Sequence, residues 1–141
     1  MMNQYQGYED DSDSIFNMMI ILDPNTYNII YRSHYNGISE NLYYDNKNNC
    51  TQIILNNGTI MNYDYDDNNN CIHMVSNSGF EQFMDYNDKN QCIHMSNNNC
   101  ECNYEYDNYG NIILERYSNG YEVYYKYDDN GNFLGSYDNI I

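Results

Sequence analysis

The chain has 141 residues, enough for one domain with a modest core, and its composition includes no Trp, a single Pro, 19 Tyr and 28 Asn. So many tyrosines argue against plain disorder, and so much Tyr without any Ala disfavours a helical bundle. Five basic residues against 21 acidic ones give a net charge of −16, which argues against direct binding to DNA, RNA or anionic lipid, because those polyanions are held by Lys and Arg.

Residues 1–21 are expected to form an acidic segment that leads into a first strand. The sequence YEDDSDS stands ahead of the most apolar run, IFNMMIIL, which extends from Ile15 to Leu22. An acidic leader is the opposite of the basic start of a signal peptide, and no run reaches the ~18 apolar residues that span a membrane. We therefore expect a cytoplasmic location, in the producing cell or in an infected one.

From residue 22 to residue 141 the chain repeats itself about every 21 residues, and we interpret this part as one domain. A Tyr followed by Asp or Asn recurs with spacings of 21, 21, 20 and 21 residues, at Tyr44, Tyr65, Tyr86, Tyr106 and Tyr127. Each of these anchor tyrosines opens a polar turn such as YDDNNN or YDDNGN, and a second turn follows, in most units ending in Gly. A weaker, earlier copy covers residues 22–37. Such a period is typical of stacked structural repeats.

Between the turns, apolar and polar residues alternate with a period of two, which predicts half-buried strands with one apolar and one wet face. The clearest examples are residues 59–65, 80–86, 100–106 and 121–127. Asn-Gly and Asp-Asn turns tolerate positive φ, so neighbouring strands can pair as hairpins. The predicted fold class is therefore all-β: a repetitive antiparallel β-meander of about 21-residue hairpin units that forms a strongly twisted or coiled sheet.

The stretch GYEVYYKYDDNGN, Gly120 to Asn132, resembles the YD repeat of the RHS and teneurin families. The resemblance extends over about residues 22–141, with the Gly and Tyr-Asp elements matched best in the last two units. In those families β-hairpin repeats coil into a large hollow shell, often around a toxin domain of a bacterial polymorphic toxin. The resemblance thus implies the same hairpin fold here, in a much shorter chain.

Metal and cofactor sites are not expected. Strand alternation would place Cys71 with His73, and Cys92 with His94, on one face, but equivalent positions two strands apart lie ~9.6 Å from each other. That distance is too long for the two pairs to share one zinc ion, and too long for a disulfide between repeat-related cysteines. The turn sequences do not meet the spacing of a calcium-binding EF-hand loop.

The chain is not expected to be an enzyme. Its carboxylates repeat along the sequence instead of converging on one site, and it has neither a nucleophile motif nor a phosphate-binding loop.

The repeated carboxylates are the candidate partner-binding residues. They are expected to stack in columns on the wet face and along one row of turns, interleaved with Tyr hydroxyls. The set comprises Asp64, Asp66, Asp67, Glu81, Asp85, Asp88, Glu101, Glu105, Asp107, Glu122, Asp128 and Asp129.

These columns predict a non-enzymatic acidic protein, monomeric or paired through sheet edges, that blocks a basic nucleic-acid-binding surface of a partner protein. Such a field of charge steers a protein onto a basic groove, and a phage anti-defence factor of the anti-CRISPR type fits the size, charge and Asn-rich composition. The alternative is a stand-alone YD-repeat immunity or scaffold protein of a polymorphic toxin system. A carbohydrate-binding surface of exposed Tyr is a third hypothesis, and the charge could also serve solubility alone.

Overall fold

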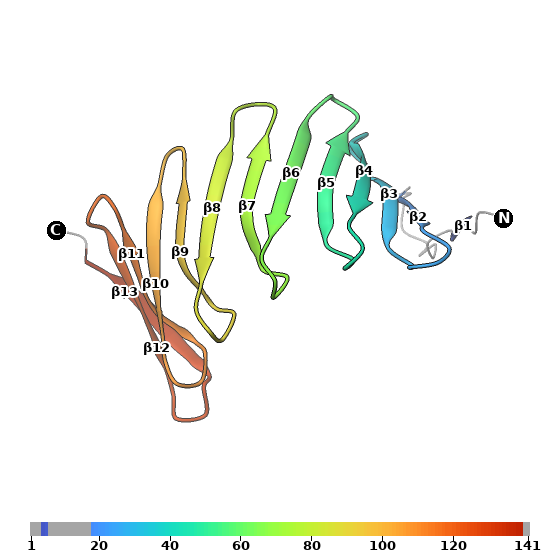
Figure 1. Ribbon diagram of the computed structural model, residues 1–141. Coiled ribbons are helices and arrows are strands. Elements are labelled where there is room, and N and C mark those ends of the chain that lie inside the picture. The colour runs from blue at the N-terminus through green and yellow to red at the C-terminus, as the bar shows by residue number, and fades with distance from the viewer. Residues whose placement is uncertain (1–3, 6–17, 140–141) are drawn as a thin grey trace. The chain divides into compact units, whose positions relative to one another are not determined.

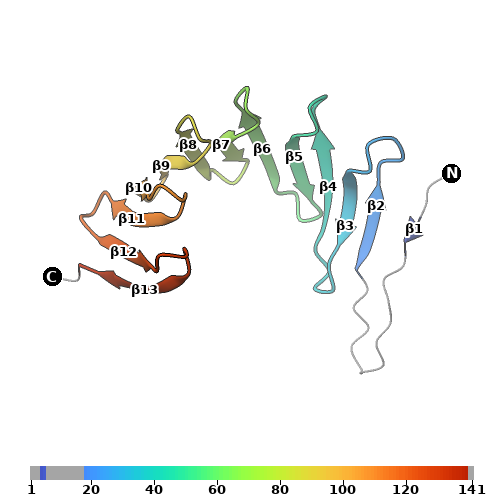
Figure 2. The ribbon, with the colours of Figure 1, turned by 90° about the horizontal axis from the view of Figure 1, so that it is seen from below.

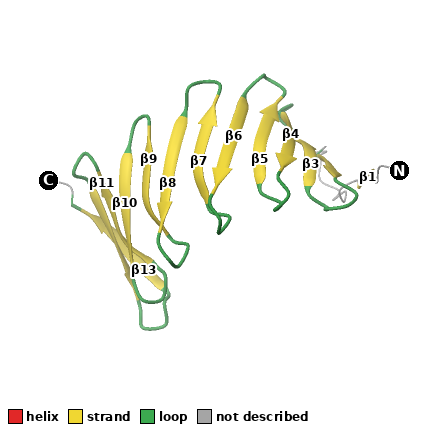
Figure 3. Ribbon diagram, in the orientation of Figure 1, coloured by secondary structure: helices red, strands yellow, loops and turns green. Residues whose placement is uncertain are grey.

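The computed structural model describes residues 4–5 and 18–139, and in that part of the chain every regular element is a β-strand (Figure 3). The strands form a 13-stranded sheet whose order follows the sequence (Figure 1). They are β1 (Gln4–Tyr5), β2 (Met19–Leu22), β3 (Ile29–Ser33), β4 (Ser39–Tyr44), β5 (Cys50–Leu55), β6 (Ile60–Tyr65), β7 (Cys71–Ser76), β8 (Glu81–Tyr86), β9 (Cys92–Asn97), β10 (Glu101–Tyr106), β11 (Ile112–Tyr117), β12 (Glu122–Tyr127) and β13 (Phe133–Asp138). The predicted all-β meander of hairpin units is confirmed. Most of the predicted acidic segment, residues 1–3 and 6–17, lies outside the described residues.

The chain divides into two compact units. The first comprises Met1–Tyr65 and Met74–Gly79, and the second comprises Asp66–His73 and Phe80–Ile141. Within the second unit β10 pairs with β11, β11 with β12 and β12 with β13, all antiparallel, and Figure 2 shows these four strands side by side.

A β-bulge recurs at the start of the return strands. In the β8–β9 pair Tyr86 lies opposite Cys92 but Asp85 lies opposite His94, so Ile93 has no partner in the ladder. The same shift occurs between β2 and β3, β4 and β5, β10 and β11, and β12 and β13. An extra residue interrupts the period of two, and Cys92 and His94 therefore lie on opposite faces. The prediction that they share one face was wrong.

The register defines two faces in the second unit. One row across the sheet joins Met84, Met95, Cys102 and Tyr117, which lie opposite one another in successive pairs. We call this the tyrosine face, because the anchor tyrosines of β8, β10 and β12 lie on it. The other row joins Asp85, His94, Asn103, Arg116 and Glu122, and we call it the charged face. The predicted alternation of apolar and polar side chains along β8 and β10 is confirmed.

Four anchor tyrosines hydrogen-bond to the main chain. The hydroxyl of Tyr106 donates to the carbonyl of Cys92, the first residue of the preceding strand, at 2.6 Å. The β9–β10 ladder ends at the pair His94 and Asn103, two residues short of that carbonyl, so the tyrosine replaces a ladder hydrogen bond where the strands separate. The equivalent bonds are Tyr44 to Ile29 at 2.9 Å, Tyr65 to Cys50 at 2.8 Å and Tyr86 to Cys71 at 3.0 Å.

The turn after each anchor tyrosine needs one residue with positive φ. Asn48, Asn69 and Asn90 hold this position with φ of 68°, 65° and 60°, and Gly110 and Gly131 hold it in the last two units. Asn can thus replace the Gly of the YD pattern, because its short polar side chain tolerates the left-handed region. The single 20-residue spacing arises at the opposite edge, where Asn97 closes a shorter turn by donating its N–H to the carbonyl of Cys100.

Tyr106→Phe is expected to lower the free energy of unfolding by about 1–2 kcal/mol, because it leaves the Cys92 carbonyl without its donor and keeps the ring. Urea denaturation followed by circular dichroism measures the change. Tyr109→Phe is the matched control: its side chain is 81% exposed, and we expect a change within about 0.5 kcal/mol. Equal effects of the two substitutions would contradict a structural role for the anchor hydroxyl.

Candidate functional site

The aspartates that directly follow the anchor tyrosines hold their own turns closed. Asp107 Oδ1 accepts hydrogen bonds from the backbone N–H groups of Tyr109 and Asn111, both at 2.9 Å, and Oδ2 accepts one from the Asn111 side chain at 2.9 Å. Asp45, Asp66 and Asp128 make the same set of bonds to their turns. Asn87 replaces the aspartate in one unit, and there its amide donates to Gln91 Oε1 at 2.9 Å.

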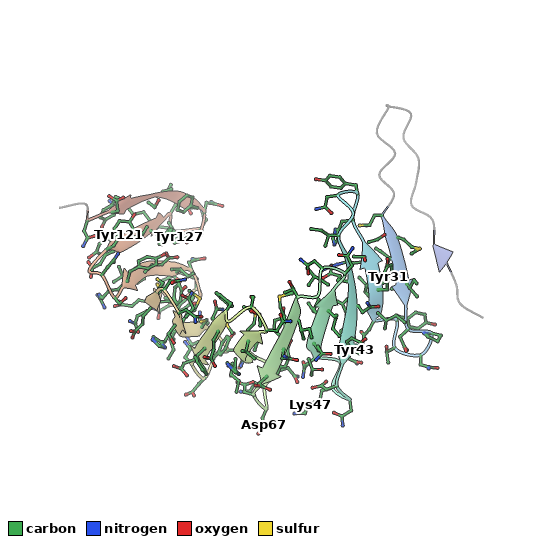
Figure 4. The ribbon with its side chains drawn as sticks, turned by 90° about the horizontal axis from the view of Figure 1, so that it is seen from above. Tyr31, Tyr43, Lys47, Asp67, Tyr121 and Tyr127 are labelled. Carbon is green, nitrogen blue, oxygen red and sulfur yellow. The ribbon has the colours of Figure 1, made fainter. Side chains whose placement is uncertain are left out.

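These hydrogen bonds stabilise the ionised carboxylate. The pKa of Asp107 is lowered chiefly by the side-chain bond from Asn111, and the pKa of Asp128 chiefly by the side-chain bond from Asn132. The predicted site residues Asp66, Asp107 and Asp128 therefore have a structural role within their turns. Asp67 and Asp129, which follow two of them, and Asp88, which follows Asn87, are exposed, and Figure 4 shows Asp67 on the turn after β6.

Basic side chains of the same chain lie among the predicted columns of strand carboxylates. His94 lies between Asp85, at 3.1 Å from Nδ1, and Glu101, at 3.2 Å from Nε2. Arg116 lies between Glu122, at 2.8 Å, and Glu105, at 3.3 Å. On the charged face of the second unit, His94 and Arg116 thus each lie between two strand carboxylates. The prediction of stacked carboxylate columns did not include these basic residues of the return strands, and the binding of a partner by the carboxylates stays a prediction.

Two further predicted residues have different surroundings. Glu81 lies 3.1 Å from His73, whose ring also stacks on Phe83 with centroids 4.5 Å apart. Asp64 occupies the fifth position of β6 and is exposed. The equivalent position of β12 is Lys126, whose ammonium lies 4.9 Å from the centre of the Tyr137 ring.

The hydroxyls of the anchor tyrosines do not interleave with the strand carboxylates. The anchor tyrosines of the second unit lie on the opposite face and donate to the main chain. Tyr124 lies on the charged face, where its hydroxyl donates to Glu122 Oε2 at 2.5 Å. Its ring stacks on the ring of Tyr137, with centroids 5.0 Å apart. Tyr121 precedes β12 and Tyr127 ends it (Figure 4).

The sequence comparison missed two glutamates on the tyrosine side of the strands. Glu40 is 7% exposed and pairs with Arg32 and with His34, the latter at 3.1 Å. Burial raises the pKa of Glu40, but the bonds from Arg32 and His34 outweigh it and the pKa is lowered. Glu115 lies opposite Tyr104 in the β10–β11 pair. Neither glutamate recurs at its repeat position in the other units, so a search for repeated carboxylates misses both.

The part of the chain that the structure describes contains no group of three or more His, Cys, Asp or Glu side chains placed to hold a metal ion. Within the same residues no helix is long and apolar enough to cross a membrane.

No family model and no curated protein matches this sequence. The fold is similar to a chain in the crystal structure of TcdB2-TccC3-Cdc42, with a TM-score of 0.66 and 16% identity. It is also similar to a chain in the structure of the Photorhabdus luminescens Tc holotoxin pore with mutated TccC3, with a TM-score of 0.64 and 17% identity. Each match covers 89% of this chain and 7% of the other. The predicted RHS-type β-hairpin fold is confirmed.

Asp128→Ala is expected to lower stability at pH 7, and the loss should shrink as the pH falls. The folded-state pKa of Asp128 is depressed, so its stabilisation is present above the unfolded pKa of about 3.9 and is lost as the pH falls through the folded value. Urea denaturation of the variant and the wild type at pH 7 and pH 3 measures this.

The matched control is Asp129→Ala, at the exposed neighbouring position of the same turn. It should leave stability nearly unchanged at both pH values. A loss for Asp128→Ala that is the same at pH 3 as at pH 7 would contradict the role of the ionised carboxylate.

Proposed function

We propose that this chain is a non-enzymatic protein-binding component of a polymorphic toxin system, acting as a scaffold or immunity protein built from YD-repeat-type hairpins. The observation that carries the proposal is the likeness of 89% of the chain to chains of Tc toxin assemblies. An array of stacked hairpins presents side chains at regular intervals along an extended surface, which suits binding to another protein.

The use of the carboxylates within the chain supports a scaffold over a charge mimic. Four turn aspartates are engaged by their own turns. On the charged face of the second unit, His73, His94 and Arg116 each pair with at least one strand carboxylate. Much of the acidic composition therefore contributes to the fold, and a smaller part is left for a basic partner.

A second candidate function is the one that the charge favours: an acidic inhibitor that blocks a basic nucleic-acid-binding surface. The net charge of −16 supports it, together with a set of exposed carboxylates on the strands and turns. These are Asp64, Asp67, Asp85, Asp88, Glu101, Glu105 and Asp129.

Affinity capture from a lysate of the encoding cell, with mass spectrometry of the bound proteins, separates the two. For the scaffold we expect a protein of a toxin system to be recovered and retained when salt is raised from ~50 to ~200 mM. A complex driven by charge weakens steeply over that range.

A variant with Asp88 and Asp129 changed to Asn serves as the control, because it removes exposed charge at two turns and keeps the carboxylates that close them. It should retain a scaffold partner and lose a basic one. Recovery of a nucleic-acid-binding protein that is lost both at ~200 mM salt and in this variant would overturn the scaffold proposal in favour of the inhibitor.

A further inference from the structure

Arg32 and Glu115 hold the same repeat position with opposite charge. Each stands two residues after the bulge residue of its strand, which is Ile30 in β3 and Ile113 in β11. Arg32 lies opposite Glu40 and forms an ion pair with it. In the first unit, therefore, the carboxylate on this side of the sheet has its own guanidinium partner.

Glu115 has no such partner. The residue opposite it on β12 is Val123, and the residue opposite it on β10 is Tyr104. Arg116 and Lys126 belong to the charged face, as their pairing with Glu122 and with the ring of Tyr137 shows. Within the described residues no Lys, Arg or His forms an ion pair with Glu115.

Three tyrosines surround this carboxylate. The hydroxyl of Tyr117 donates to Glu115 Oε2 at 2.8 Å. Burial raises the pKa of Tyr125, and a hydrogen bond to Glu115 raises it further. Tyr104 lies directly across the ladder, and its pKa is raised by burial and then by Cys102, with Glu115 adding to the effect. All four side chains are half-buried, so the cluster is built into the sheet and still reaches solvent.

A carboxylate beside several aromatic rings favours an organic cation. The carboxylate supplies the opposite charge, and the ring faces attract a cation through their quadrupoles. A guanidinium fits both features best, because it is planar, stacks on aromatic faces and donates two parallel hydrogen bonds to a carboxylate. The Arg32–Glu40 pair of the first unit shows that the same repeat position accommodates a guanidinium next to a glutamate.

We propose that Glu115, Tyr104, Tyr117 and Tyr125 form a binding site for the guanidinium group of an arginine side chain on a partner protein. This goes beyond the proposed function, because the site recognises a chemical group and not a particular toxin. Its test needs only the purified chain and a free peptide, so its outcome does not depend on the toxin-system proposal.

The probe is the capped peptide acetyl-Gly-Arg-Gly-amide, titrated into the ¹⁵N-labelled protein and followed by NMR. We expect saturable shifts concentrated at Tyr104, Glu115 and Val123. Glu115→Gln should weaken binding at least about tenfold while preserving the spectrum of the folded protein. The matched control Glu101→Gln removes a carboxylate from the charged face and should leave the affinity unchanged.

Two further arms keep the proposal testable. Tyr125→Leu should also weaken binding, which provides a second variant if Glu115→Gln disturbs the fold. Methylguanidinium at the same concentrations should shift the same residues, since the site recognises the group itself. The proposal is overturned if a citrulline peptide of the same length binds equally well, if the shifts centre on the charged face, or if both site variants bind like the wild type.

Discussion

The hydrogen bond from an anchor tyrosine hydroxyl to a main-chain carbonyl is the interaction on which the rest of the sheet depends. Among the described residues only Leu42, Cys102 and Leu114 are buried apolar side chains, so a conventional core contributes little. Each bulge bends its strand and ends the ladder to the next strand early. The tyrosine covers the gap with its ring and satisfies the exposed carbonyl with its hydroxyl, which an aliphatic residue could not do.

Asparagine side chains likewise donate hydrogen bonds to main-chain carbonyls at the turns. The side-chain amides of Asn56, Asn77 and Asn139 donate to the carbonyls of Gly37, Gly58 and Gly120, at 2.8, 2.9 and 3.1 Å, and so join successive turns of one edge. On the other edge the Asn28 amide donates to Asn48 Oδ1 and the Asn70 amide to Asn90 Oδ1. The many asparagines, which give the chain a composition like that of low-complexity sequences, thus form specific hydrogen bonds to main-chain and side-chain groups of other turns. The turn aspartates belong to the same network, which is why the charge of the chain overstates the charge open to a partner.

The period, the strands and the outward position of Glu81, Asp85, Glu101 and Glu105 could be predicted from the sequence, because hairpin turns and a two-residue alternation are local signals. The bulges could not, since the extra residue is visible only against the opposite strand. Its effect is to reverse the face of every residue that follows, which separates Cys92 from His94 and places His94 between two carboxylates. Glu115 was missed for a related reason. Only the register shows that the residue opposite it on β12 is the uncharged Val123 and not a basic residue.

The most direct test of this account is the register between β8 and β9, measured by cross-strand nuclear Overhauser effects between backbone protons. We predict that Tyr86 aligns with Cys92 and Asp85 with His94, leaving Ile93 without an opposite residue. Uninterrupted alternation, with Asp85 opposite Ile93 and Met84 opposite His94, would place the histidine on the tyrosine face. That result would contradict both the two-faced sheet and the sites assigned to it.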